Sequence, residues 1–404
     1  MTHIASQYGS LAELKAWLLD HVCPFWGNAV FDPKGGFFES LDDNGVPVQS
    51  TTRSVLTQAR LTYVFSHAHC LQATEQSLRY AEHGFRFLQR AAELAGGDCG
   101  WHRAITVDGI VIDGERDAYD QAFVILALAW YYRASAHPQA LALAERAYGF
   151  MDAHLADQQH GGFFEEYSLI DGVQKLPRRQ NPHMHLLEAV LAMHQASREP
   201  QWLERAKKLV SLFKQHFFDT ATGSLVEYFN ADWSPAASPM GALREPGHHF
   251  EWVWLLHEYF DASGDPEVLD FAQRLFAFGS SYGIDMQGPL AGMVFDGVNA
   301  DGGLVAGSKL LWPQTECIKA CLALGEWRGD AQIHAAAHVH AAAMRRHFFK
   351  EDGASWHNQL SRSGAPLQSA TPARVLYHLF LAMAELLRCS ALVDTGEAQM
   401  PRVT

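Results

Sequence analysis

Two kinds of predicted helix alternate along the chain. One kind is amphipathic, with apolar residues on one face and charged residues on the other, and it recurs at 74–94, 138–155, 200–217, 265–280 and 330–348. The other kind is apolar nearly all round, as at 123–130 and 253–256. A helix that is apolar on every side has to be buried on every side. The alternation therefore predicts an inner layer of buried helices and an outer layer that covers them.

A short segment of glycine and aromatic or apolar residues returns six times between these helix pairs. Its glycines, spaced by 61 to 69 residues, are Gly36, Gly100, Gly162, Gly223, Gly292 and Gly353. A second turn follows several of them, as in Asp43-Asn44-Gly45, which is typical of a short β-hairpin. A repeat that cannot bury its own apolar face must stack on its neighbours, and six such units can close into a ring.

We therefore predict an all-α fold, an (α/α)6 barrel (toroid) of six helical hairpins, with short β-hairpins at the active-site end. The alternative is an open helical solenoid, which the glycine-aromatic hairpins disfavour. No Pro/Ser-rich linker or charge block interrupts the pattern, so residues 1–393 are expected to form one domain, followed by a polar C-terminal tail at 394–404.

Composition narrows the classes of partner and location. The chain of 404 residues is 48% hydrophobic and 19% charged, which permits a sizeable core. A net charge of −14 argues against a nucleic-acid or anionic-membrane surface, although it leaves room for a small anionic ligand held by placed arginines. The N-terminus lacks the features of a signal peptide, and no apolar run reaches the roughly 18 residues of a membrane span. The six cysteines show no paired spacing, so reduced thiols and a cytoplasmic location are expected.

The candidate chemistry lies where the buried helices begin. Four of these starts carry a proline, which a first helical turn tolerates: Asn181-Pro182, Glu245-Pro246, Trp312-Pro313 and Thr371-Pro372. If the inner helices are parallel, their first turns meet at one end of the barrel. The polar residues near those starts are Arg53, Asp117, Tyr119, Asp120, Asn181, His183, His185, Glu188, His248, His249, Glu251, Gln314, Glu316 and His378. The positive end of a helix disfavours imidazolium, so these histidines would be available as bases near neutral pH.

Metal binding and core packing are the other interpretations of such residues. The pairs His185/Glu188 and His248/Glu251 have a spacing that metal ligands use, but no further ligand cluster completes them, and we expect no catalytic metal. Isolated histidines are more often part of a core, and we expect no function for His334, His338 and His340 or for Cys317 and Cys321. No Walker A, G-x-S-x-G or Rossmann glycine pattern is present, which leaves phosphoryl transfer, serine nucleophiles and hydride transfer without support.

The motifs at four of these helix starts are similar to those of the N-acylglucosamine 2-epimerase superfamily of sugar epimerases and isomerases. The similarity extends over nearly the whole chain. It rests on Asn-Pro-His-Met-His-Leu-Leu-Glu-Ala at 181–189, Pro-Gly-His-His-Phe-Glu-Trp at 246–252, Trp-Pro-Gln-Thr-Glu at 312–316 and Tyr377-His378. The family fold is an (α/α)6 barrel, in agreement with the fold predicted from the repeats.

The resemblance implies reversible chemistry at C2 of an open-chain aldose, through a cis-enediol or enediolate and without a metal or redox cofactor. It implies that His248 and His378 are the acid/base pair and that Arg53 stabilises the developing oxyanion. It also implies that substrate is bound by Tyr119, Asn181, His185, Glu251, Trp312 and Glu316. The expected partner is a small-molecule sugar, such as an acetamido sugar or mannose, and a homodimer is compatible with the sequence.

Two functions of other classes are the alternatives. An (α/α)6 glycoside hydrolase would need two facing carboxylates, which Glu165, Glu166, Glu251 and Glu316 could supply. A non-catalytic sugar-binding toroid would depend on the aromatic side chains and would leave the histidines without a role.

Overall fold

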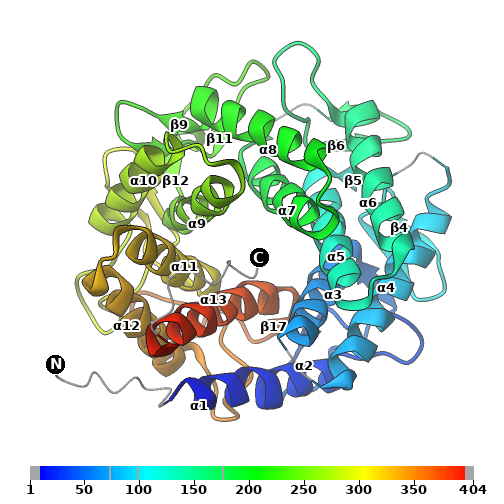
Figure 1. Ribbon diagram of the computed structural model, residues 1–404, viewed down its shortest axis with the longest axis horizontal. Helices are drawn as coiled ribbons and strands as arrows, with labels where there is room; N and C mark the ends of the chain where they lie inside the picture. Colours follow the sequence, from blue (N-terminus) through cyan, green and yellow to red (C-terminus); the bar gives the residue numbers. More distant parts are fainter. Residues whose placement is uncertain (1–9, 72–73, 98–99, 175–176, 396–404) are drawn as a thin grey trace.

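Two concentric rings of helices surround a central axis in the computed structural model, which describes residues 10–71, 74–97, 100–174 and 177–395 (Figure 1). Each inner helix contacts the next, and the last inner helix contacts the first, so the ring is closed. The predicted (α/α)6 toroid is confirmed, and the open solenoid is excluded. Most of the predicted tail, 396–404, lies outside the described residues, and the last helix includes positions 394 and 395.

The inner ring consists of α3 (Val55–Cys70), α5 (Ala118–Ser135), α7 (Asn181–Ser197), α9 (Pro246–Ser263), α11 (Leu311–Arg328) and α13 (Leu376–Thr395). The outer ring consists of α1 (Leu11–Ala16) with η1 (Trp17–Val22) and α2 (Cys23–Ala29), α4 (Glu75–Leu94), α6 (Pro138–Phe150) with η2 (Met151–Leu155), α8 (Pro200–Leu212) with η3 (Phe213–Phe217), α10 (Val268–Tyr282) and α12 (Ala331–Phe348). The outer helices bury one face, whereas α5 is buried almost continuously from Ala118 to Tyr131. The two predicted kinds of helix thus occupy the two rings.

One predicted helix start is wrong. Pro372 lies in a strand, and α13 begins at Leu376 after a short 3-10 turn, η5 (Ala373–Val375). A proline is tolerated at an edge strand as well as at a first helical turn, so its presence alone does not choose between them.

Short strands link neighbouring repeats at the end where the inner helices begin. Their bounds are β1 (Ser40–Leu41), β2 (Thr52–Ser54), β3 (Ala104–Thr106), β4 (Val111–Asp113), β5 (Arg116–Asp117), β6 (Glu166–Ser168), β7 (Gly172–Gln174), β8 (Arg178–Arg179), β9 (Phe218–Asp219), β10 (Ser224–Leu225), β11 (Tyr228–Phe229), β12 (Leu243–Arg244), β13 (Gly297–Asn299), β14 (Leu304–Ala306), β15 (Lys309–Leu310), β16 (Gln359–Leu360) and β17 (Thr371–Pro372), with a 3-10 turn η4 (Met240–Ala242) before β12. The strand before each inner helix pairs antiparallel with the next repeat, and β17 pairs with β1. The first and last repeats are therefore joined by backbone hydrogen bonds as well as by helix packing.

A side chain in or near the first turn of an inner helix binds the glycine-aromatic segment of the same repeat. The Gln58 amide accepts a hydrogen bond from the Phe37 N–H (2.7 Å) and donates one to the Phe37 carbonyl (2.9 Å). The same pair of bonds joins Gln121 to Trp101 and Gln314 to Val294. A Cβ on Gly36 would lie 2.6 Å from the Gln58 oxygen, so this close approach requires the glycine.

In the third and fourth repeats a histidine takes the place of this glutamine. His183 Nε2 accepts from the Phe163 N–H (2.8 Å) while its Nδ1–H donates to the Arg179 carbonyl (3.1 Å). His249 binds Leu225 and its own preceding turn in the same way. Burial lowers the pKa of His183 to about 3 and that of His249 to about 4. Both imidazoles are thus neutral and stabilise the fold by binding the backbone. Their positions in the sequence had suggested that they were candidate bases.

None of the helices in the described part of the chain combines the length and the apolar character that crossing a membrane requires.

His183 and His249 should make the folded protein sensitive to acid. Their pKa values lie below the value of about 6.5 for an unfolded histidine, so between these limits the unfolded chain binds protons that the folded chain does not. The free energy of unfolding should therefore fall as the pH drops from about 6.5 toward 4, by about 1.4 kcal/mol per pH unit for each histidine. Glutamine fills the same position in three other repeats and does not titrate. We expect the His183→Gln/His249→Gln variant to unfold at lower pH than the parent, as followed by circular dichroism.

The control for this experiment is His137→Gln, at an exposed position. An unchanged acid midpoint in the double variant, or an equal displacement in the control, would contradict the role given to these two histidines.

Candidate active site

Side chains from four inner helices converge on the barrel axis near the helix starts. His185 comes from α7, His248 and Glu251 from α9, Glu316 from α11 and His378 from α13, and all are buried. The imidazole rings of His185 and His378 are 6.5 Å apart between centroids. The half-buried Trp312 ring lies 4.9 Å from His248 and 5.7 Å from His378, so one indole is adjacent to both histidines. The structure thus brings these predicted site residues together.

His248 is held in its charged form by two carboxylates. Its Nδ1–H donates to Glu227 (2.9 Å), and Glu245 lies 3.5 Å from the same nitrogen. Burial disfavours the imidazolium, but the attraction of Glu227 and Glu245 is stronger and raises the pKa of His248 to about 10. His248 is therefore a proton donor at neutral pH.

His378 has the opposite electrostatic environment. Burial, followed by the positive charges of Arg60 and Lys319, lowers its pKa well below the usual range. Its Nδ1–H donates to Glu316 (2.8 Å), which orients the ring and leaves Nε2 with a free lone pair. His378 is therefore a neutral base. One site thus contains an imidazolium and an imidazole on two sides of the same tryptophan.

Several buried oxygens at the site have no hydrogen-bond partner among the described residues. Both carboxylate oxygens of Glu251 are among them, and at the start of α7 the side-chain oxygen of Asn181 is likewise buried without a hydrogen-bond partner. Burial and the neighbouring Glu316 raise the pKa of Glu251 well above its usual range, which favours the protonated carboxyl group. Polar groups that are buried without partners are costly, and they are typical of positions that a polar ligand fills.

His185 and Tyr119 extend the site toward α3 and α5. His185 Nδ1 lies 3.3 Å from Glu188, and its ring is 5.0 Å from that of Tyr119. The Tyr119 hydroxyl accepts a hydrogen bond of 2.6 Å from Arg60, whose guanidinium also lies over the rings of Phe123 and Tyr377.

Arg53 does not join these residues. Its fully buried guanidinium binds Asp32 (2.5 Å) and the carbonyls of Ser50 and Thr52. The same basic-acidic contact occurs in other repeats, in the pairs Arg178/Asp157, Arg244/Asp219 and Lys309/Asp285. Arg53 is therefore one copy of a repeated structural ion pair, and the expectation that it faces the substrate is corrected.

Arg60 is the arginine that reaches the site, and it was not among the predicted residues because it is the sixth residue of α3 rather than a residue at the helix start. Lys319 was missed for the same reason; its ammonium is 2.6 Å from Glu316 and fully buried. The signal for both was a basic residue in the interior of a mainly apolar inner helix. Glu227, the partner of His248, was recognisable only as the acidic residue of a repeated segment.

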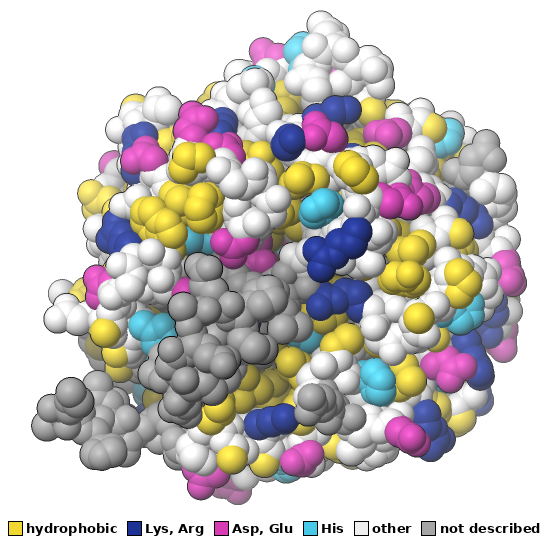
Figure 2. All heavy atoms as spheres, in the orientation of Figure 1, with side chains coloured by type: hydrophobic (Ala, Val, Ile, Leu, Met, Phe, Trp, Pro, Cys, Tyr) yellow, Lys and Arg dark blue, Asp and Glu magenta, His cyan; other side chains and the backbone are white. Residues whose placement is uncertain are grey.

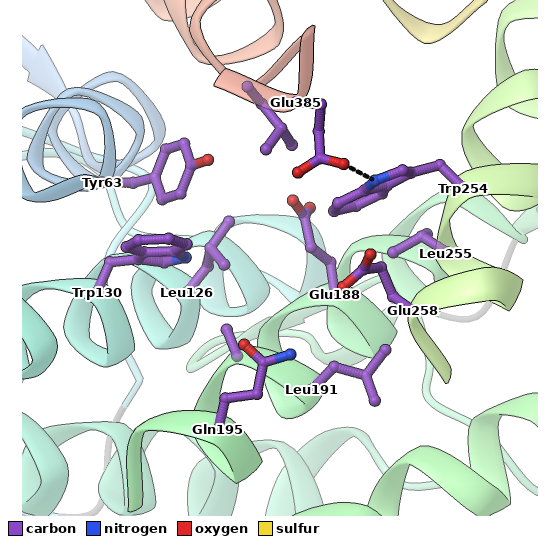
Figure 3. A pocket seen from close by; sticks show the side chains of 12 residues that line it. Tyr63, Leu126, Trp130, Glu188, Leu191, Gln195, Trp254, Leu255, Glu258 and Glu385 are labelled. Carbon is purple, nitrogen blue, oxygen red and sulfur yellow. Dashed lines mark hydrogen bonds between the residues drawn. The ribbon is translucent and has the colours of Figure 1, made fainter. Parts of the chain in front are cut away.

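The axis beneath the site is filled mainly by side chains. The Tyr377 hydroxyl donates to Glu188, and beyond Glu188 a cavity of about 30 Å³ is lined by Tyr63, Trp130, Trp254 and Glu385 (Figure 3). In this view the carboxylates of Glu188 and Glu385 point toward one another, and the indole N–H of Trp254 donates to Glu385 (3.4 Å). Such a cavity holds about one or two water molecules.

Three groups in the site have the spacing of a metal site, with one histidine and two carboxylates whose ligand atoms lie within 4.8 Å of one another. They are His185/Glu188/Glu251, His248/Glu227/Glu245 and His378/Glu251/Glu316. In the last group Lys319 already supplies a positive charge against Glu316, and in the second His248 itself is cationic. Glu316 and Glu227 thus already face a positive charge, whereas both carboxylate oxygens of Glu251 have no hydrogen-bond partner among the described residues.

Of the four carboxylates that a hydrolase could use, Glu251 and Glu316 lie together in the site, whereas Glu165 and Glu166 bind arginines of the strands. Glu165 binds the backbone N–H and the guanidinium of Arg179, and Glu166 forms an ion pair with Arg103, so both are tied to the strands.

The chain matches the N-acylglucosamine 2-epimerase (GlcNAc 2-epimerase) family over residues 36–382. It is 32% identical over 388 residues to the mannose-6-phosphate isomerase of Rhizobium meliloti (strain 1021), covering 93% of this chain and 96% of that one. It is 28% identical to the D-mannose isomerase of Thermobifida fusca, covering 84% of each chain. A crystal structure of a D-mannose isomerase superposes with a TM-score of 0.85 at 24% identity, covering 96% of this chain and 99% of that one.

Distant similarity extends to glycoside hydrolases. The GH76 α-mannanase BT2949 of Bacteroides thetaiotaomicron superposes with a TM-score of 0.68 at 12% identity, covering 98% of this chain and 99% of that one. At this identity the similarity concerns the fold alone.

The ion pair between Glu227 and His248 predicts that the pKa of His248 depends on the charge of Glu227. In Glu227→Gln the hydrogen bond can persist while the charge is lost, so the pKa of His248 should fall from about 10 by about 1 to 3 pH units. The measurement is an NMR titration of the His248 ring protons, with the exposed Glu204→Gln as the control. A pKa that is equal in the two variants would refute this electrostatic assignment.

Proposed function

Because the chain belongs to the N-acylglucosamine 2-epimerase family and is a sugar isomerase or epimerase, we propose that it moves the C2 proton of a free, open-chain aldose through a cis-enediol or enediolate. The observation that carries the proposal is the opposite protonation of two histidines beside one tryptophan. Groups whose environments separate their pKa values in this way are suited to act as acid and base.

In this mechanism His378 Nε2 removes the C2 proton. Glu316, which accepts the His378 Nδ1–H, stabilises the imidazolium that forms. His248 donates a proton to the sugar oxygen that becomes negative, and Glu227 keeps it charged until then. Return of a proton to C1, with loss of the O2 hydroxyl proton to His248, gives the ketose, whereas return of a proton to C2 from the opposite face, with loss of the O1 hydroxyl proton to His248, gives the epimer.

Arg60 takes the role that the resemblance assigned to Arg53. Its fixed charge, packed against aromatic rings in a buried site, would stabilise an enediolate. Trp312 offers the apolar surface against which the sugar packs. The unpartnered groups of Glu251 and Asn181, together with His185, Tyr119 and Glu316, bind and orient the hydroxyls.

We propose a mannose-type aldose as the substrate and ketose formation as the main reaction. Two relatives that support this choice, at 32% and 28% identity, are named as isomerases of mannose 6-phosphate and of D-mannose. The second candidate is 2-epimerisation, because the chain is also 22% identical to a cellobiose 2-epimerase of Ruminococcus albus.

Proton NMR in D2O tests the reaction and the substrate together. With mannose we expect the C2 proton signal to decline while ketose signals appear, because the enediol exchanges its proton with solvent. Parallel samples with mannose 6-phosphate, N-acetylmannosamine and cellobiose identify the preferred aldose, and a 2-epimer in place of a ketose would favour the second candidate.

His378→Asn is the control for this experiment. It should still bind sugar, detected by isothermal titration calorimetry, but should show no exchange at C2. Exchange that persists in this variant would remove His378 from the mechanism, and hydrolysis of a glycoside without C2 exchange would favour the hydrolase.

Replacing Arg60 and replacing Arg53 should have different effects on activity and stability. Arg60→Met removes charge from the reacting centre, so we expect kcat to fall by about 10²- to 10³-fold with a minor change in stability. Arg53→Met leaves the buried Asp32 unpaired, so we expect a loss of about 3–5 kcal/mol in the free energy of unfolding and a nearly unchanged kcat for the folded fraction. Steady-state kinetics and urea unfolding measure both quantities, and the reverse pattern would restore Arg53 to the site.

A further inference from the structure

Two cysteines and a histidine meet between α11 and α12, outside the site described above. Cys317 and Cys321 lie one helical turn apart on α11, and His340 lies on the facing helix α12. Their sulfur and ring-nitrogen atoms lie within 4.8 Å of one another. The two thiols are buried and free, and His340 is half-buried. We propose that these three residues bind a thiophilic divalent metal ion such as Zn²⁺ or Cd²⁺.

The geometry is close to that of an occupied site. Zn²⁺ binds sulfur at about 2.3 Å and imidazole nitrogen at about 2.0 Å in a tetrahedral arrangement, which places ligand atoms about 3.5–3.8 Å apart. The three atoms here lie within 4.8 Å, so side-chain movements of about 1 Å would bring them to that spacing. Residues four apart on a helix share one face, and α12 packs directly on α11, so two rigid elements supply the ligands.

The charge balance favours a divalent ion. Two thiolates cancel the charge of M²⁺, and a neutral imidazole adds none, so the complex is neutral. A neutral complex is the one least penalised in apolar surroundings, and the buried α12 neighbours of His340, Ala337 and Ala341, carry no polar side chain. The two thiol protons leave to solvent as the metal binds.

The ligand set selects the class of metal. Sulfur and imidazole favour Zn²⁺, Cd²⁺ and Cu⁺ over Mg²⁺ and Ca²⁺, which prefer oxygen. Of the groups in the described ranges with metal-site spacing, this is the one that contains sulfur, and the other three belong to the active site. Three protein ligands leave a fourth position for water, and the partial exposure of His340 provides the side from which an ion enters.

Cadmium titration of the reduced, EDTA-treated and desalted full-length protein tests the proposal. Sulfur ligation produces an ultraviolet thiolate-to-cadmium charge-transfer band, which the carboxylate groups of the active site cannot produce. We expect the band to saturate at one Cd²⁺ per chain, with the stoichiometry measured independently by equilibrium dialysis.

Variants assign the ligands. Cys317→Ser and Cys321→Ser should each lose most of the band, and His340→Ala should weaken binding by roughly tenfold or more. The matched controls are Cys23→Ser, another buried thiol, and Cys70→Ser, a half-buried one, and both should retain the band. Thermal unfolding identifies any variant that fails to fold. If a serine variant fails to fold, Cys317→Ala or Cys321→Ala takes its place. Absence of the band in the parent, its persistence without Cys317 and Cys321, or its loss with Cys70 would overturn the proposal.

Discussion

The hydrogen bonds between the start of each inner helix and its glycine-aromatic segment determine where the site forms. Their side-chain partners, all buried, are Gln58, Gln121, His183, His249 and Gln314. Each satisfies a backbone N–H that would otherwise be buried without a partner. Since the bond always comes from the beginning of the helix, the hairpins and the helix starts are placed at the same end of the barrel. Five repeats of one local contact thus direct five polar helix starts toward a common axis.

A second repeated contact supplied a partner for the proposed acid. In the first, third, fourth and fifth repeats a carboxylate of the segment, Glu39, Glu165, Glu227 or Asp296, accepts a hydrogen bond from a backbone N–H beside the inner helix start. In the fourth repeat alone a histidine, His248, lies within reach of the same carboxylate. A group that elsewhere serves the fold here also determines the protonation of a site residue.

The fold was largely predictable because its signals are periodic and local. Apolar periodicity distinguished the two rings, and the spacing of Gly36, Gly100 and their equivalents gave the number of repeats. The predictions that were wrong concern the partner of an individual side chain, which periodicity does not indicate. His183 and His185 are two residues apart, yet one binds a backbone N–H and the other faces the axis, because successive side chains of a helix point about 100° apart. Likewise Arg53 binds Asp32 and Arg60 binds Tyr119, and only the folded chain determines which buried group each arginine meets.

The arrangement of buried charges explains why two histidines beside the same tryptophan have different protonation states. Glu227 and Glu245 act on His248, whereas Arg60 and Lys319 act on His378. The positive charge of Lys319 disfavours an imidazolium at His378, so in the resting site His248 is the charged histidine of this pair. In the proposed reaction His378 gains a proton while His248 gives one up, and the total charge of the pair does not change. The barrier therefore does not include the cost of creating net charge in a buried site, because the proton that His248 gives to the sugar oxygen balances the C2 proton that His378 takes up.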